Sequence, residues 1–319
     1  MTKPDTEFAT LEGKLALVTG GAGFIGSHIA QALLDHGCRV RVLDDLSTGH
    51  ARNIPAGADF MPGSILDQAL LERASASCHL VFHQAAMVSV PISVAEPGAC
   101  VRVNVVGTEM VLRAARDAGV RRVMFAASAA AYGNDPPMPT REEAPIQTLS
   151  PYAMSKVAGE LLMQTFAHCY GLSTISLRYF NIFGPRQDPK GAYAAVISAF
   201  IDALAAGRRP KVFGDGRQTR DFTPVANVVR ANLLAATCTR PLVGEVVNIG
   251  TNQRIDLLTV LDALASAMGS KVMPIFEPVR PGDVRHSVAD ISRARDLLGY
   301  VPQVDFQQGI GQLIDSLGL

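Results

Sequence analysis

A glycine-rich turn that directly follows a short apolar stretch constrains the fold of this chain more than any other feature. Residues 15–19 read Leu-Ala-Leu-Val-Thr, a strand pattern, and run straight into Gly20, Gly23 and Gly26. In such a loop the first glycine permits a tight turn, the second lets backbone amides approach a pyrophosphate, and the third lets the next helix pack closely. Apolar residues at a spacing of four then continue to Gly37, which predicts a helix after the loop.

A pair of acidic residues follows the next predicted strand. That strand, Arg39 to Leu43, ends in Asp44 and Asp45, which lie 24 and 25 positions after Gly20. A carboxylate at this place can accept hydrogen bonds from an adenosine ribose, and it repels a 2′-phosphate. A glycine triplet alone is more often an ordinary turn, but strand, loop, helix, strand and acid in this order predict a site for NAD rather than NADP.

Tyr152 and Lys156 stand four residues apart, just inside a helix start marked by Ser150 and Pro151. At this spacing two side chains share one helical face, so an ammonium can lie beside a phenol and favour its ionised form. Such a pair can take the proton from an alcohol that is being oxidised. The pair also arises by chance in other chains, so its meaning depends on the nucleotide loop at the other end of the sequence.

The overall composition excludes several classes of protein. The 319 residues carry 29 basic and 29 acidic side chains, so no electrostatic signature of a nucleic-acid or membrane-surface binder is present. The apolar fraction of 48% supports a large core, yet no apolar run approaches the roughly 20 residues that a bilayer span requires. The polar residues 1–13 are expected to form an unstructured extension without a signal peptide, and the expected compartment is cytoplasmic.

Metal binding is not expected. The five cysteines are scattered without metal-ligand spacing and are interpreted as reduced thiols. His79 and His83 are four apart, but they flank a strand-like segment, where this spacing does not bring two ligands together as it does on a helix.

Strand and helix signals alternate to about residue 180, which predicts an α/β Rossmann fold with a doubly wound parallel sheet. The pattern changes after Phe183, where Gly184 and Pro185 interrupt it. We therefore predict a NAD-binding domain over 14–182 and a smaller C-terminal α/β substrate-binding domain over 183–319. One strand-like run within 240–252 is expected to return to the main sheet. The predicted strands are 15–19, 39–43, 59–61, 80–84, 122–127, 173–178 and 246–249; the predicted helices after the first are 66–74, 101–118, 151–170 and 193–206.

Further motifs occur in a fixed order and carry a resemblance to a known family. They are a strand ending in Ser128 before Tyr132-Gly133, Asn104-Val105-Val106-Gly107-Thr108, Arg178-Tyr179-Phe180-Asn181, Gly214-Asp215-Gly216 with Arg220-Asp221, and Arg280-Pro281-Gly282-Asp283. With the glycine loop and the tyrosine–lysine pair, the chain resembles the extended short-chain dehydrogenases/reductases, in their NAD-dependent nucleotide-sugar epimerase and dehydratase branch. The resemblance is strongest to bacterial UDP-hexose and UDP-N-acetylhexosamine 4-epimerases, and it runs from about residue 14 to the C-terminus.

The resemblance implies roles for individual residues. Ser128, Tyr152 and Lys156 would be catalytic, with Ser128 bound to the hydroxyl being oxidised, Tyr152 as base and Lys156 on the nicotinamide ribose. Contacts to NAD would come from Gly20, Gly23, Phe24, Ile25, Gly26, Asp44, Asp45, Leu46, Ser64, Ile65, Gln84, Ala85, Ala86, Asn104, Tyr152, Lys156, Tyr179 and Phe180. Contacts to a UDP-sugar would come from Ser128, Tyr152, Asn181, Arg220, Arg280, Asp283 and Ser287. Two arginines suit a diphosphate, since their planar forks bind it directionally.

Ala129 and Ala130 narrow the reaction. Relatives that eliminate water carry an acidic pair here, and decarboxylating relatives keep a glutamate, whereas an alanine methyl cannot move a proton. This favours 4-epimerisation, in which C4 of the sugar is oxidised to a ketone and the hydride returns to the opposite face. UDP-glucuronate 4-epimerisation, or another dehydratase or decarboxylase activity, remains the alternative. A protein that only senses NAD is a non-enzymatic alternative, but such relatives typically lose the tyrosine or the lysine.

The preferred sugar depends on Ser287, which by the resemblance lines the sugar pocket. A tyrosine there restricts related enzymes to plain hexoses, whereas a small residue admits an N-acetyl group, so UDP-GlcNAc and UDP-GalNAc are expected alongside UDP-glucose and UDP-galactose. Three residues depart from the family pattern, namely Ser64 at a usual aspartate, Val88 at a usual lysine, and Ala130 at a position that often carries a hydroxyl. The helices at 101–118 and 151–170 imply a homodimer through a four-helix interface.

Overall fold

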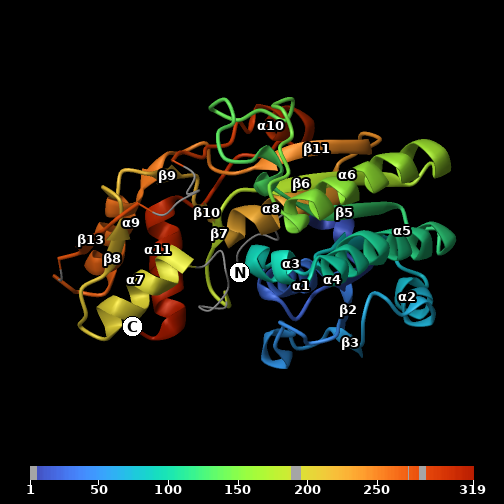
Figure 1. Cartoon of the computed structure of the whole chain (residues 1–319). Coiled ribbons are helices and arrows are strands. Elements are labelled where there is room, and N and C mark those ends of the chain that lie inside the picture. The colour runs from blue at the N-terminus through green and yellow to red at the C-terminus, as the bar shows by residue number, and fades with distance from the viewer. Residues whose placement is uncertain (1–5, 188–194, 272, 280–284) are drawn as a thin grey trace.

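The computed structural model describes residues 6–187, 195–271, 273–279 and 285–319. Its main sheet is parallel and has seven strands in the order β11-β6-β5-β4-β1-β2-β3. The sheet lies in the right-hand part of Figure 1. These strands are β1 (Leu15–Thr19), β2 (Arg39–Asp44), β3 (Asp59–Pro62), β4 (Leu80–His83), β5 (Arg122–Ser128), β6 (Ser173–Tyr179) and β11 (Val243–Ile249). The strand order reverses between β1 and β4, so this is a doubly wound sheet with its switch point there.

Helices cover both faces of this sheet because successive strand residues point to opposite sides. Ala16 and Val18 of β1 pack on one face, in a core that includes residues of the helices α1 (Phe24–Asp35), α8 (Val225–Thr237) and α10 (Ser292–Leu298). Leu15 and Leu17 pack on the other face, in a core with residues of α2 (Gln68–Ser75), α5 (Gly107–Asp117) and α6 (Pro151–Tyr170). The predicted Rossmann fold is therefore confirmed.

The helix predicted over 101–118 is interrupted in the structure. It consists of α4 (Pro97–Val101), a π-helical segment Arg102–Val106 and α5, and the short α3 (Val90–Ala95) precedes it. A π-helical turn inserts an extra residue and often marks a functional site. Here it carries the buried Asn104, whose contacts are described below.

A separate core lies within the smaller C-terminal lobe, which is on the left of Figure 1. Buried residues of three helices meet in it, among them Phe200, Leu261 and Ile314. The helices of this lobe are α7 (Ala195–Ala205), α9 (Leu257–Ala267) and α11 (Phe306–Leu317). Its strands are short and form two-stranded pairs: β7 (Ile182–Phe183) with β10 (Thr223–Pro224), β8 (Lys211–Phe213) with β13 (Ile275–Glu277), and β9 (Thr219–Arg220) with β12 (Ile255–Asp256).

The N-terminal segment differs from the unstructured extension predicted over 1–13. A 3-10 helix spans Thr6–Leu11, and its Phe8 and Leu11 are buried in the core beneath α1 and α8. Glu7 also forms an ion pair with Arg230 of α8 at 2.6 Å. Two buried apolar side chains and this ion pair thus hold residues 6–11 on the body of the protein.

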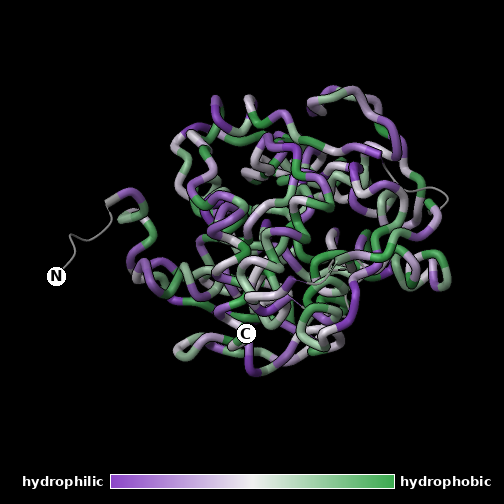
Figure 2. Tube along the Cα trace, turned by 90° about the vertical axis from the view of Figure 1, so that its left-hand side faces the viewer, coloured by the Kyte–Doolittle hydropathy of each residue, from purple (hydrophilic) through white to green (hydrophobic). Residues whose placement is uncertain are grey.

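Hydrophobic and hydrophilic residues are interspersed along the whole trace in Figure 2. Within the described parts of the chain, no helix combines the length and the apolar character needed to cross a membrane.

Candidate active site

The predicted site residues converge at the carboxyl ends of the parallel strands. In-register pairing places Thr19 beside His83, and Ser128 beside Tyr179, at this edge of the sheet. The glycine loop leaves β1 next to the switch point, which is where doubly wound sheets bind their ligands.

The glycine loop is tightly constrained by its own backbone. The Gly20 amide donates to Leu43 O at 2.8 Å, and Gly20 has a φ of +71°. A Cβ on Gly20 would lie 2.6 Å from the Ala85 nitrogen, and one on Gly26 would collide with the Gly20 carbonyl oxygen. By contrast, a Cβ on Gly23 would meet only Gly20 O, at 3.2 Å. A side chain is thus excluded at Gly20 and Gly26, whereas at Gly23 it would have only one close contact.

Asp44 at the end of β2 is the acid that contacts this loop. It is buried, and its carboxylate accepts the Ala22 amide at 2.9 Å and the Leu46 amide at 2.8 Å. Burial raises the pKa of Asp44, and these two hydrogen bonds oppose the rise. Each carboxylate oxygen keeps a further lone pair for a ligand hydroxyl. The neighbouring Asp45 is exposed and accepts the Ser47 amide at 3.0 Å.

The described residues fit a dinucleotide. One edge of the sheet is lined by the glycine loop, the Asp44 carboxylate and the residues after β4. At this edge the side-chain Nε2 of Gln84 is buried and has no hydrogen-bond partner among the described residues. Ala85 and Ala86 follow Gln84 and are half-buried. Ile65 packs against Gly107, and the hydroxyl of Ser64 accepts the Leu66 amide at 3.3 Å. The predicted residues after β3 and β4 therefore lie on the same side as the loop.

Helix α6 carries the tyrosine–lysine pair and begins where predicted. Ser150 caps it by accepting the Ala153 amide at 3.1 Å, and Pro151 occupies its first turn. Tyr152 and Lys156 are both buried, and the Tyr152 and Ser128 hydroxyls form a hydrogen bond. All three predicted catalytic residues therefore come together above the end of β5.

The electrostatics of this pair differ from the sequence prediction. The Lys156 Nζ donates to Ala126 O at 2.8 Å and lies 5.9 Å from the centroid of the Tyr152 ring, so the backbone carbonyl and not the phenol is its hydrogen-bond partner. Burial raises the pKa of Tyr152, the bond to Ser128 opposes this rise, and Cys100 adds to it. Burial also lowers the pKa of Lys156 to about 8. The protein chain itself therefore disfavours the tyrosinate.

His83 is a buried neighbour of the lysine that sequence reasoning weighed only as a metal ligand. Its Nδ1 lies 2.8 Å from the Thr19 hydroxyl and its Nε2 lies 2.9 Å from that of Thr108. Burial and the charge of Lys156 lower its pKa to about 3, so the imidazole is neutral. The two threonines occupy both ring nitrogens, and among the described residues no group of His, Cys, Asp and Glu could hold a metal ion.

Both the oxygen and the nitrogen of the Asn104 side-chain amide form hydrogen bonds within the protein. Its oxygen accepts the Met87 amide at 2.7 Å, and its nitrogen donates to Met87 O and to the Ser155 hydroxyl, each at 2.9 Å. The side chain therefore ties the segment after β4 to the helix that carries Tyr152. A direct contact with the cofactor stays a prediction.

Tyr179 and Phe180 lie at the carboxyl end of β6, where Tyr179 pairs with Ser128 of β5. The Tyr179 hydroxyl accepts from Asn232 Nδ2 at 2.9 Å and lies 3.4 Å from Gln84 Oε1, and burial raises its pKa to about 12. Phe180 is buried beside Tyr132. Both rings are packed into protein, and their contact with the nicotinamide stays a prediction.

The side chain of Asp221 lies among the chain segments that carry Asn181, Arg220 and Ser287, three of the residues predicted for the substrate. This side chain is fully buried and accepts the amides of Thr251 at 2.7 Å, Asn252 at 3.0 Å and Ala289 at 3.1 Å. Its backbone oxygen accepts from Asn181 Nδ2 at 3.3 Å.

Arg220 precedes Asp221 and lies on β9, opposite Ile255 of β12. Ser287 donates its amide to Thr219 O at 3.0 Å, which places it next to Arg220. Asn181, Arg220 and Ser287 are thus brought to one region. Arg280 and Asp283 lie outside the described residues.

Sequence reasoning missed several buried groups around the catalytic helix. Glu160 lies one helical turn after Lys156 and forms a two-pronged ion pair with Arg178, at 2.8 and 2.7 Å. Ser155 and Ser93 bind the backbone of Tyr152, as described below. The spacing of four between Lys156 and Glu160 indicates that the two side chains share one helical face. No pattern in the sequence around Ser93 indicates a contact with Tyr152.

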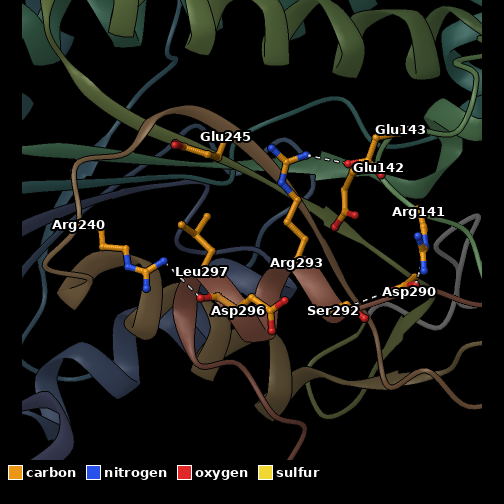
Figure 3. Close-up of a pocket in the computed structure, with 10 residues that line it drawn as sticks. All are labelled: Arg141, Glu142, Glu143, Arg240, Glu245, Asp290, Ser292, Arg293, Asp296 and Leu297. Atoms are coloured by element: carbon orange, nitrogen blue, oxygen red, sulfur yellow. Dashed lines mark hydrogen bonds and ion pairs between the residues drawn. The ribbon is translucent and has the colours of Figure 1, made fainter.

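A cavity of about 510 Å³ lies elsewhere, between α10 and the segment before β11 (Figure 3). Charged residues line it, and these pair with each other, as Arg141 does with Asp290 at 3.1 Å and Arg293 with Glu143 at 3.5 Å. None of the predicted site residues borders this cavity. The chemistry is therefore assigned to the sheet edge.

A nucleotide loop on a doubly wound sheet, with a group of Ser128 and the buried Tyr152 and Lys156 beside it, defines an enzyme that uses a nicotinamide dinucleotide for a redox step. A sequence profile of the NAD dependent epimerase/dehydratase family matches residues 16–250. The chain therefore belongs to the NAD-dependent epimerase/dehydratase family, and its cofactor is NAD.

Individual relatives agree with this membership. The chain is 41% identical over 306 residues to a UDP-glucose 4-epimerase of Mycolicibacterium smegmatis, with 94% of this chain and 97% of the relative covered. A solved UDP-N-acetylglucosamine 4-epimerase from Methanobrevibacter ruminantium M1, in complex with UDP-N-acetylmuramic acid, superposes with a TM-score of 0.90 at 36% identity, covering 96% of this chain and 98% of that one. A UDP-glucose 4-epimerase from Thermotoga maritima with UDP-glucose gives a TM-score of 0.89 at 37% identity, covering 95% and 98%.

Proposed function

We propose that this enzyme interconverts the C4 epimers of a UDP-sugar through a transient 4-keto sugar. The observation that carries the proposal is the composition of the site around Ser128. Ser128 meets Tyr152, and the next two residues are the half-buried Ala129 and Ala130. A site with one base and no adjacent acid can oxidise and reduce the same carbon, but it lacks the groups that water elimination requires.

The proposed roles follow from the geometry. Tyr152 takes the proton of the C4 hydroxyl, Ser128 hydrogen-bonds the same oxygen, and Lys156 holds the ribose of the cofactor. NAD would supply the acceptor for the C4 hydride and the source of the hydride that adds to the opposite face of the ketone. Tyr152 then gives the proton back, so no net oxidation results. Positioned proton transfer of this kind contributes roughly 10² to 10⁴ in rate.

Cofactor binding is proposed at the edge formed by the glycine loop, Asp44 and the segment from Gln84 to Ala86. The buried carboxylate of Asp44 accepts the ribose hydroxyls and repels a 2′-phosphate, as argued from the sequence. The diphosphate of the sugar nucleotide is proposed to bind Asn181 and Arg220, with Arg280 as a further predicted ligand, and Asp283 is proposed to bind a ribose hydroxyl. On this view the NAD-binding part spans 14–182 with 240–252, and residues 183–319 bind the substrate.

We propose N-acetylated as well as plain hexoses as substrates. The small side chain of Ser287 is half-buried beside β9, near Arg220. The similarity to a UDP-N-acetylglucosamine 4-epimerase supports this range. A Ser287→Tyr variant should lose activity on UDP-GlcNAc while keeping it on UDP-glucose, measured by resolving the C4 epimers. Equal losses on both substrates would contradict the role of Ser287.

The reaction itself is tested by an epimerisation assay on UDP-glucose, UDP-N-acetylglucosamine and UDP-glucuronate. We expect C4 epimers from at least one of the first two, and a transient rise in reduced-nicotinamide absorbance when that sugar is added. Turnover of UDP-glucuronate alone would identify the uronate epimerase instead. No absorbance change with any UDP-sugar would favour a protein that only senses NAD.

We further propose a homodimer through α4, α5 and α6 with the intervening π-helical segment. Met154 and Leu161 are seven residues apart on one face of α6 and are 39% and 57% exposed, and Val106 is 46% exposed. Apolar side chains gathered on adjoining elements typically mark an interface. Light scattering should report a dimer, and Leu161→Glu should shift it to monomer. A monomeric parent protein would contradict the proposal.

A further inference from the structure

Two serine hydroxyls hold the backbone of Tyr152 from both sides. The Tyr152 amide donates to Ser93 Oγ at 3.2 Å, and the Tyr152 carbonyl accepts from Ser155 Oγ at 2.8 Å. Both serines are fully buried. The Tyr152 amide is in the first turn of α6, where amides lack an acceptor within the helix, and the cap Ser150 serves the Ala153 amide instead. Ser93 therefore satisfies a donor that the helix itself leaves open.

The hydroxyl of Ser93 is oriented for this contact. It donates its single proton to Val90 O at 2.7 Å, within the short helix α3. Only the oxygen lone pairs remain, so towards Tyr152 the group can act only as an acceptor. Ser89 caps α3 by accepting the Ile92 amide at 3.3 Å, which fixes the turn that presents Ser93.

The position of α3 gives this hydrogen bond a function. The helix follows the segment Gln84–Met87, which leaves β4 on the cofactor side of the site. Ser93 thus joins the cofactor side to the residue that removes the proton, by a route independent of β5 and Ser128. The Asn104 amide, bonded to Met87 and to Ser155, joins the same two parts from the other side of Tyr152.

We propose that Ser93 is a positioning residue for Tyr152, and this rests on the proposed function. Ser93 acts through the backbone of Tyr152 and does not touch the substrate. Proton transfer requires the phenol oxygen within hydrogen-bond reach of the sugar hydroxyl, and a displacement of about 1 Å can cost 10²-fold in rate. Holding the tyrosine amide fixes the base of that side chain relative to the cofactor segment.

The test compares Ser93→Ala with Ser93→Thr. The alanine leaves the buried Tyr152 amide without its acceptor, so kcat should fall roughly ten- to a hundredfold. The KM for the UDP-sugar and the NAD content should stay within about twofold of the parent values, because neither ligand site is altered. The threonine keeps the hydroxyl and can make the same bond to the preceding turn, so it should restore most of the lost kcat.

Ser75→Ala is the matched control. Ser75 is also fully buried, ends α2 away from Tyr152, and its hydroxyl has no hydrogen-bond partner among the described residues. We expect kcat per NAD-loaded site to stay unchanged in this variant. A full kcat in Ser93→Ala, or an equal loss in both alanine variants, would overturn the proposal.

Ionisation of Tyr152 gives a readout that does not depend on turnover. Its titration is obtained by subtracting the absorbance of a Tyr152→Phe protein from that of the parent. Burial raises this pKa, so loosening the residue in Ser93→Ala should lower the pH at which it ionises, with no change in Ser75→Ala. If the parent turns over no UDP-sugar, the proposed function is wrong. The titration still tests whether Ser93 positions Tyr152. An unchanged titration in Ser93→Ala would overturn the positioning role.

Discussion

The cofactor side and the substrate side of the site are built in different ways. On the cofactor side, residues come from contiguous motifs at the ends of long parallel strands, and backbone contacts such as Gly20 to Leu43 hold them. On the substrate side, Asn181 and Arg220 come from two-residue strands and connecting segments that meet around Asp221.

The difference follows from what each side must do. Hydride and proton transfer tolerate little displacement, so the groups that perform them belong on rigid elements. Choice of sugar depends on the size of a few side chains on connecting segments, which can change without altering the sheet. The predictions below test whether damage to one side spares the other.

The largest effect is expected from Tyr152→Phe, which removes the base and keeps the ring. The rate should fall by roughly 10² to 10⁴ with NAD and UDP-sugar binding retained. Steady-state kinetics together with calorimetric titration of the UDP-sugar would measure this. Retained activity would show that another group removes the proton.

A second large effect is expected from Gly26→Ala on the cofactor side. The added methyl collides with the Gly20 carbonyl, so the loop must shift, the bound NAD should be lost, and stability should fall by about 1 to 3 kcal/mol. Gly311→Ala in α11 is the control in the other lobe, since its methyl would meet nothing within 4 Å. NAD content and denaturant unfolding report the outcome; equal behaviour of the two variants would contradict the assigned role of the loop.

A smaller effect, confined to the substrate side, is expected from Asp221→Asn. The amide turns an NH₂ group toward backbone donors that the carboxylate now accepts, at a cost of about 1 to 3 kcal/mol. The KM for the UDP-sugar should rise roughly tenfold while NAD content stays unchanged. Asp296→Asn, whose side chain is 70% exposed, is the control. Loss of NAD in Asp221→Asn would show that the two sides are not separable.

The smallest effect is on stability, from Lys156→Met. Burial lowers the pKa of Lys156 from 10.5 to about 8, so the folded chain binds this proton less tightly than the unfolded chain. The contribution of Lys156 to the free energy of unfolding therefore rises with pH between about 8 and 10.5 and is a penalty at lower pH. Lys156→Met should be inactive yet more stable than the parent by about 1 kcal/mol at pH 7, because the lost hydrogen bond to Ala126 offsets part of the gain. A stability difference between Lys156→Met and the parent that stays constant across this pH window would contradict the burial penalty.

The features that the sequence predicts well are those with a strong local signal. Strand β1 and helix α6 have the predicted bounds, because an apolar run with a glycine stop and a helix with Ser150 and Pro151 at its start are strong local signals. The Ser128, Tyr152 and Lys156 group could be predicted because its members lie in recognisable motifs.

The rest depends on contacts between segments far apart in the chain. The π-helical turn at Asn104 forms around hydrogen bonds to Met87 and Ser155, and no periodicity marks it. Phe8 and Leu11 are buried although their segment is mostly polar. The paired strands of the C-terminal lobe have only two or three residues, too few to show alternation. The burial that raises the pKa of Tyr152 also depends on such contacts and cannot be read from the spacing to Lys156.

The central claim is that one carbon of the sugar loses a hydride and regains it within the same site. The most direct measurement uses a UDP-hexose that carries deuterium at C4 and follows the label into the epimer by mass spectrometry and NMR. The account predicts that the epimer keeps the deuterium at C4 and takes up none at that carbon from deuterated solvent. Exchange of the C4 label with solvent during epimerisation would contradict it.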